Sequence, residues 1–369
     1  EYTKENISNY FLGIISANQD YNSDAFKFLN KVRSLKNNHT KFNIEYIRTL
    51  ILLDKFDRAF SFSKEVWAEE EYFFEADLLL GLESYLKKDY LKAEKHFERL
   101  NKISTYNFFF EDFIGNTLES WNKATQGNEE GSFQSLEKVP KIYSHITKIQ
   151  NSFLHCYFSN YETEKHFKDL INNKEYNFSR YNFFLANDFI YKNKIESAKI
   201  IINSARKKNR SNLLLKQTQI FLLNNNTNKI KDFFNCQNAE NVMAEFFYIL
   251  ANLYSSERDY QMSNFYMKIS IFLNNKFSPN KSLLAENYFN QGRYEKSSFF
   301  FNSLKSIGSE YSWYASKILS KILLEEKGVE YSVKKLQKEF NLIPNPNFMH
   351  YYELANFYKE NEYYEESVK

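Results

Sequence analysis

Six histidines and two cysteines are the residues of this sequence whose types suit metal binding or nucleophilic chemistry. The densest group contains His145, His155, Cys156 and His166. Its histidines are ten and eleven residues apart, whereas two ligands on one helix face are about four residues apart. Cys156 and Cys236 are too few and too distant in the chain for a zinc pattern or a disulfide framework. We therefore predict no metal site and two buried free thiols.

Motifs typical of enzymes do not occur in the sequence. There is no glycine-rich phosphate loop, no His-Glu-x-x-His motif and no nucleophile elbow. Acidic runs at 69–71 and 325–326 are typical of solvated helix faces. Because catalysis needs an acid, a base or a nucleophile gathered in one pocket, we predict a non-catalytic protein without a cofactor. The alternative is an accessory or substrate-presenting arm of an enzyme or envelope assembly complex.

Composition and charge exclude several classes of protein. Gly 8 and Pro 4 in 369 residues leave few turn residues for a many-stranded fold. Hydrophobic residues at 43% are enough for a large core, which argues against disorder. No uncharged apolar stretch approaches the ~18 to 20 residues of a membrane helix, so we expect no transmembrane segment. A net charge of +3 predicts no nucleic-acid partner, and an RNA-binding helical repeat is the weaker alternative.

The sequence repeats with a period of 34 residues. One position per unit, small in most units, recurs at this spacing within three groups: Ala25, Ala59 and Ala93; Glu164 and Ala198; Ser263 and Ser297. The gaps between and after these groups are close to two periods, so each hides one degenerate unit. These units lie near residues 105–145, 210–238 and 312–342, with centres near Leu136, Ile230 and Val333. The length divided by the period is about 10.9, which predicts eleven units with the last cut short.

A second mark lies twelve to thirteen residues before the small position. It is a Leu followed by Gly or Ala, at Leu12-Gly13, Leu80-Gly81, Leu185-Ala186, Leu250-Ala251, Leu284-Ala285 and Leu354-Ala355. Such a unit predicts two amphipathic helices of about 12 to 14 residues, packed antiparallel across a short polar turn. Small residues let the two backbones approach closely, and aromatic residues fill the space between units. Because no unit can bury its apolar face alone, we predict one all-α solenoid over residues 1–369.

This pattern resembles the tetratricopeptide repeat, in which Leu-Gly or Leu-Ala precedes an aromatic residue, then Gly or Asp, then Tyr, then Ala. Two clear copies are Leu80-Gly81 with Asp89-Tyr90 and Ala93, and Leu284-Ala285 with Tyr288, Gly292 and Tyr294. The resemblance implies a right-handed superhelix of helical hairpins that serves as a protein-protein interaction scaffold. The order of units is also similar to long exported bacterial proteins built almost wholly from these repeats. That likeness implies a periplasmic or otherwise exported protein with further segments beyond both ends, and a cytoplasmic location is the alternative.

The resemblance also implies a binding surface. In this family the first helix of each unit lines the concave face, and two inward positions flank the Leu of the pair at i and i+4. In this sequence they are Phe183 with Asn187, Tyr248 with Asn252, Ser282 with Glu286, and Tyr352 with Asn356. Amides can hydrogen-bond a peptide backbone, and aromatic rings give contact area at low entropy cost. We therefore predict a protein or peptide ligand on this face. The lysine of a carboxylate clamp is missing there.

Overall fold

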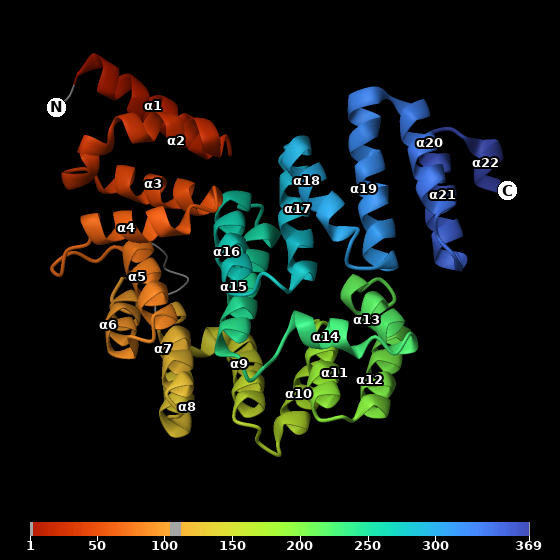
Figure 1. The fold of residues 1–369 in the computed structure, drawn as a ribbon, viewed down its shortest axis with the longest axis horizontal. Coiled ribbons are helices and arrows are strands. Elements are labelled where there is room, and N and C mark those ends of the chain that lie inside the picture. The colour runs from red at the N-terminus through yellow and green to blue at the C-terminus, as the bar shows by residue number, and fades with distance from the viewer. Residues whose placement is uncertain (1–2, 104–111, 369) are drawn as a thin grey trace. The chain divides into compact units, whose positions relative to one another are not determined.

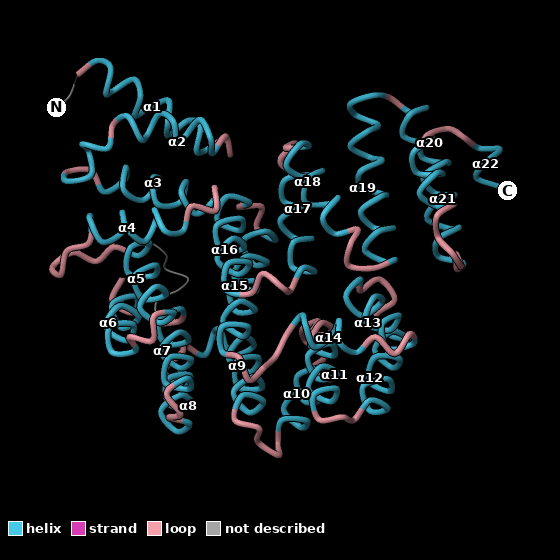
Figure 2. The backbone as a smooth tube through the Cα atoms, in the orientation of Figure 1, coloured by secondary structure: helices cyan, strands magenta, loops and turns pink. Residues whose placement is uncertain are grey.

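The computed structural model describes residues 3–103 and 112–368, and within them it is all α-helical, with no strand. Within these described residues, twenty-two α-helices follow one another as eleven hairpins. Figures 1 and 2 show how consecutive helices are paired. The predicted fold class and the predicted number of hairpins are therefore confirmed. The beginning of the degenerate unit near 105–145 lies outside the described residues.

The chain forms two compact units, each built from two stretches of sequence. Unit 1 comprises Glu1–Tyr181 and Asn235–Asn274, and unit 2 comprises Asn182–Phe234 and Asn275–Lys369. The single solenoid domain predicted for the whole chain stays a prediction.

The helices of unit 1 are α1 (Lys4–Asn18), α2 (Asn22–Lys31), α3 (Thr40–Leu52), α4 (Phe56–Val66), α5 (Phe74–Leu86), α6 (Tyr90–Leu100), α7 (Ile114–Thr125), α8 (Glu129–Glu137), α9 (Ser144–Tyr157), α10 (Thr163–Ile171), α15 (Ala239–Ser256) and α16 (Tyr260–Leu273). Those of unit 2 are α11 (Tyr181–Tyr191), which begins at the last residue of unit 1, and α12 (Ile195–Lys208), α13 (Leu213–Leu223), α14 (Thr227–Phe233), α17 (Lys281–Asn290), α18 (Tyr294–Leu304), α19 (Ser309–Lys327), α20 (Val329–Phe340), α21 (Phe348–Glu360) and α22 (Tyr364–Val368). Short 3-10 helices span Arg33–Asn37, Lys141–Tyr143 and Ser278–Asn280.

Each hairpin turn contains one residue with a positive φ. These residues, 32 to 39 positions apart, are Asp20, Asp54, Lys88, Gly127, Ser159, Asn193, Asn225, Arg258, Gly292, Gly328 and Glu362. A left-handed residue lets the chain leave the first helix with its last carbonyls hydrogen-bonded. At Gly292 (φ 69°) an added Cβ would meet no atom within 4 Å, so conformation alone favours glycine there. The three degenerate units have this turn too, so their backbone keeps the repeat although their sequence has lost it.

The small position of each unit lies between the two helices of its hairpin. Its side chain is 0% exposed at Ala25, Ala59, Ala93, Ala198, Ser263 and Ser297. In the unit where Glu164 was predicted, the spacing of the turn residues Ser159 and Asn193 is 34, as expected, but the fully buried residue is the preceding Thr163, and Glu164 is only half-buried. Ser132, Ile230 and Ser332 are 0% exposed in the degenerate units.

Serine replaces alanine here because its hydroxyl finds a partner across the hairpin. Ser263 Oγ donates to the carbonyl of Ala251 at 2.7 Å, and Ser297 Oγ donates to that of Ala285 at 3.0 Å. No buried hydroxyl is then left without a hydrogen bond at these two sites. In the hairpin of α5 and α6, a Cβ added to Gly81 would lie 2.5 Å from Phe97 Cε1, which explains the small residue on the facing helix.

In unit 1 the expected packing of neighbouring hairpins is joined by contacts between hairpins far apart in the chain. Helix α16 packs against α3. Lys268 Nζ of α16 lies 2.6 Å from Asp54 Oδ2, and the Phe272 ring stacks on Phe56 with centroids 4.0 Å apart. These contacts attach the 235–274 stretch to the N-terminal hairpins.

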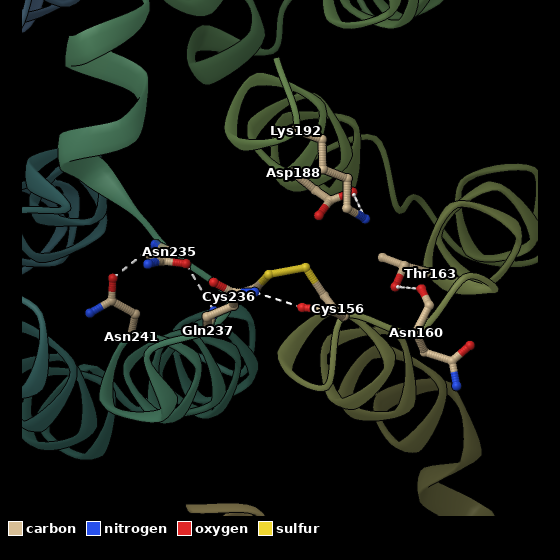
Figure 3. Close-up of a disulfide and its surroundings, with 10 residues drawn as sticks. Cys156, Asn160, Thr163, Asp188, Lys192, Asn235, Cys236, Gln237 and Asn241 are labelled. Carbon is tan, nitrogen blue, oxygen red and sulfur yellow. Dashed lines mark hydrogen bonds and ion pairs between the residues drawn. A yellow bond between two sulfur atoms is a disulfide. The ribbon is translucent and has the colours of Figure 1, made fainter. Parts of the chain in front are cut away.

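A disulfide between Cys156 and Cys236 also closes unit 1, so the prediction of two free thiols was wrong (Figure 3). It links α9 to the segment before α15, where the two Cα atoms are 5.9 Å apart. Hydrogen bonds hold this segment in place: Gln237 Nε2 donates to Ser159 Oγ at 2.7 Å, and the backbone N–H of Asn235 donates to Asn241 Oδ1 at 3.0 Å. The disulfide brings together two residues that are 80 positions apart in the chain. The sequence spacing alone does not reveal this contact.

Candidate functional site

Unit 2 contains a cleft of about 430 Å³, here called the unit 2 cleft. Its walls come from α13, α17, α19 and α21, which are the first helices of four hairpins, and from the turn before α13. These four helices are labelled in Figure 1. The lining combines aromatic, aliphatic, basic and acidic side chains: Arg210, Ser211, Leu213, Lys216, Ser282, Glu286, Glu310, Trp313, Tyr314, Lys317, Met349 and Glu353. This size lies within the range of small-ligand and peptide side-chain pockets, ~300 to 1,000 Å³.

One wall carries a paired acid. Glu353 of α21 lies 2.8 Å from Lys317 Nζ and accepts a hydrogen bond from Trp313 Nε1 at 2.6 Å. Burial on its own would raise the pKa of Glu353, but these two donors outweigh it and hold the pKa below its ordinary value. Burial lowers the pKa of Lys317. The pair therefore fixes α21 to α19 beside the cleft.

A second acid lies at the start of α19. Glu310 is buried, with Lys216 Nζ 4.0 Å away and His350 Nε2 3.9 Å away. The Nδ1 atom of His350 accepts a hydrogen bond from the Asn347 backbone N–H at 3.1 Å in the capping box of α21. Neutral His350 therefore carries its proton on Nε2, toward Glu310. Burial lowers the pKa of His350.

The third acid, Glu286 of α17, is arranged differently. Its Oε1 accepts a hydrogen bond from the Tyr314 hydroxyl at 2.7 Å. Within residues 3–103 and 112–368, no lysine, arginine or histidine nitrogen lies within 4.0 Å of the Glu286 carboxylate, the distance of an ion pair. Burial raises the pKa of Glu286, and the Tyr314 hydrogen bond only partly opposes that change. Burial, together with the Glu286 charge, raises the pKa of Tyr314.

The structure brings one of the four predicted pairs into the cleft. Ser282 and Glu286 line it together, on α17. The Ser282 hydroxyl donates to the Pro279 carbonyl at 2.8 Å, so its hydrogen is already engaged. Tyr352 of α21 is 52% exposed and Asn356 is half-buried, and neither is among the lining residues.

The other two pairs lie elsewhere. Phe183 and Asn187 of α11 are 0% and 1% exposed, so neither side chain reaches the surface, contrary to the prediction. Asn187 Nδ2 donates to the Ile230 carbonyl at 3.0 Å, which shows that this face of α11 packs on its neighbouring hairpin. Tyr248 and Asn252 belong to α15 of unit 1. Asn252 is exposed, and Tyr248 is half-buried, with the Arg180 guanidinium carbon 4.0 Å from its ring centroid.

Four residues of α19 that the sequence did not suggest contribute to the cleft: Glu310, Trp313, Tyr314 and Lys317. They lie in the degenerate unit near 312–342, where no Leu-Ala pair marks the inward face. Their spacing of three or four residues was the available signal, because it places them on one face of a helix.

The histidine group at 145–166 is partly assembled. The His155 and His166 rings, on α9 and α10, stack with centroids 3.8 Å apart, and His145 stacks on Tyr176 at 4.9 Å. The absence of a metal site stays a prediction. In the described residues, no helix combines the length and the apolar character needed to cross a membrane.

No protein-family model matches the chain, and a comparison with curated proteins finds no match. Solved structures give weak likenesses. A chain of the Naa15/Naa10 complex bound to HypK-THB is 12% identical with a TM-score of 0.30, over 99% of this chain and 62% of that one. A chain of the APC/C hetero-tetramer Cut9-Hcn1 is 11% identical with a TM-score of 0.30, over 98% of this chain and 85% of that one.

Yeast Tom70 is 11% identical with a TM-score of 0.29, over 98% of this chain and 88% of that one. The present chain thus spans less than two thirds of the first of these three structures. At these values the likenesses carry no argument about function. The assignment of the fold as tetratricopeptide-like helical hairpins rests on the helices, turns and small positions described above.

Proposed function

We propose that the chain is a non-catalytic protein-protein interaction scaffold and that the unit 2 cleft binds a peptide segment of its partner. The observation that carries this proposal is the cleft itself, formed by the first helices of four hairpins. Aromatic and basic side chains line it, and these types concentrate binding energy at interfaces. Met349, at 40% exposed, adds an adaptable apolar contact.

The charges of the cleft support binding rather than catalysis. Glu353 and Glu310 are turned toward basic groups of the cleft, and the Ser282 hydroxyl is bonded to a backbone carbonyl. Acyl or phosphoryl transfer requires a nucleophile beside a free general base. Glu353, Glu310 and Ser282 do not provide such a pair. Their pairing instead gives a preformed surface with little to reorganise when a ligand binds.

The disulfide supports export of the protein to an oxidising compartment, such as the periplasm. Cys156 and Cys236 are both buried and bonded. Disulfides persist in secreted and periplasmic proteins and are rare in the cytosol, where thiols are kept reduced. A periplasmic scaffold would keep the covalent closure of unit 1 throughout its working life.

Panning of a phage-displayed peptide library against the purified chain tests the function. Peptides that emerge are then titrated by fluorescence anisotropy against wild type, Met349→Glu and Leu342→Glu. Met349 lines the cleft, whereas Leu342 is 69% exposed and outside it. We expect a loss of affinity of about tenfold or more for Met349→Glu, from a buried unpaired charge, and none for Leu342→Glu.

Equal affinity for all three proteins would place peptide binding outside the unit 2 cleft. No enriched peptide at all, together with salt-sensitive binding of single-stranded RNA, would replace the scaffold by an RNA-binding repeat.

A further inference from the structure

The three carboxylates of the unit 2 cleft differ in what neutralises them. Glu353 and Glu310 each have a lysine ammonium within 4.0 Å. Glu286 accepts a hydrogen bond from a neutral donor, the Tyr314 hydroxyl at 2.7 Å. No cationic side chain of the described residues forms an ion pair with it. The cleft therefore offers one negative group whose positive partner the surrounding helices do not supply.

This imbalance has an energetic consequence. A carboxylate removed from water loses solvation, and a single neutral hydrogen bond recovers only part of it. The same loss of solvation favours the protonated carboxyl group, and burial therefore raises the pKa of Glu286. A cation that enters the cleft with a ligand recovers the remainder, because it forms a charge-assisted hydrogen bond away from bulk water.

We propose that Glu286 selects the peptide ligand, by binding the ammonium or guanidinium of a lysine or arginine side chain. This assignment rests on the peptide-binding function proposed above. The rest of the lining suits such a side chain, since Tyr314 and Met349 provide apolar surface for its methylene stem. The hydrogen bond from its hydroxyl keeps the Tyr314 side chain beside the carboxylate.

Other charged ligands fit this lining less well. Calcium requires six or more oxygen ligands, and among the described residues Glu286, Glu310 and Glu353 do not form a group of ligand atoms close enough to hold a metal ion. A carboxylate ligand that paired with Lys317 would have to displace Glu353, and one that paired with Arg210, on the turn before α13, would leave Glu286 without a cation. A basic peptide side chain needs no such displacement.

The test uses the full chain and an array of short N-acetylated peptides of mixed sequence, whose central residue is Lys, Arg, norleucine or Glu. Acetylation leaves the side chain as the designed cation. We expect wild type to bind the Lys and Arg series about tenfold more tightly than the norleucine series, as one charge-assisted hydrogen bond supplies. Glu286→Gln keeps an oxygen that accepts from Tyr314 and should bind the Lys, Arg and norleucine series alike.

Glu325→Gln is the matched control, because it removes the same charge from an exposed position of α19 outside the cleft. It should keep the full preference for basic residues. A preference that survives in Glu286→Gln overturns the assignment, and so does wild-type binding that ignores the central residue. Binding of no peptide by wild type overturns the proposed function itself, so the two failures are distinguishable.

Discussion

Two acids on first helices of unit 1 are paired with arginine, whereas one acid on a first helix of unit 2, Glu286, is not. In unit 1, Glu245 of α15 is buried and bonded to Arg180 through both carboxylate oxygens, at 2.7 and 2.8 Å. Glu75 of α5 is likewise buried and lies 2.6 Å from Arg48. In unit 2, Glu286 of α17 has a tyrosine hydroxyl where these have an arginine. Whether an acid holds parts of the fold together or remains available to a ligand therefore depends on one partner residue from elsewhere in the chain.

The largest expected effect comes from breaking the buried arginine–glutamate pair of unit 1. Arg180→Ala leaves Glu245 buried without its bidentate partner and removes the guanidinium that covers Tyr248. We expect a loss of about 3 to 5 kcal/mol in the free energy of unfolding, measured by urea denaturation followed by circular dichroism. Arg206→Ala, at a half-buried arginine on α12, is the control. A loss below about 1 kcal/mol would mean that the pair is solvated and does not stabilise unit 1.

Removing the disulfide has the next largest effect. Cys156→Ser with Cys236→Ser opens a loop of 80 residues and leaves the polar contacts of the 235–237 segment to hold α15 against α9. We expect about 2 to 4 kcal/mol less stability, mostly through a less restricted unfolded chain. The urea midpoint of oxidised wild type, of wild type with reductant and of the double variant checks this expectation. The last two should coincide, and a midpoint unchanged by reductant would contradict it.

Much of the fold could be predicted because repetition reports the same physical requirement many times. Each described hairpin needs a residue that packs between its two helices, and this residue is small in most units, so a lost signal at one unit is restored by the spacing of the others. At Glu164 the period itself holds, since the turn residues Ser159 and Asn193 are 34 positions apart, but α10 begins only at Thr163, and Thr163 takes the buried place. The disulfide has no such redundancy, since one contact between distant residues leaves no periodic trace.

The candidate site was harder to predict than the fold. Ser282 and Glu286 follow from the resemblance, whereas α19 lies in a degenerate unit and was missed. Phe183 and Asn187 satisfy the same rule as Ser282 and Glu286, yet they pack against a neighbouring hairpin. The inward face of a helix becomes a surface only where the adjacent hairpin leaves it open, and hairpin packing is a property of several units together.

The smallest expected effect is that of Glu286→Gln on stability, and it compares the acids of the two units most directly. Burial raises the folded-state pKa of Glu286 above the ordinary value of about 4.3, so folding favours its protonated form. Its contribution to stability is then fully present below about pH 4.3 and is lost as pH rises through the raised pKa. The neutral amide removes this dependence and should increase the free energy of unfolding at pH 7 by about 1 kcal/mol or less.

In contrast, Glu245→Gln should destabilise the protein at pH 7, because Arg180 then loses its counter-charge. Thermal unfolding of both variants between pH 4 and pH 8 measures the contrast. If Glu286→Gln were destabilising at pH 7 as well, Glu286 would be a structural acid like those of unit 1, and the difference between the two regions would disappear.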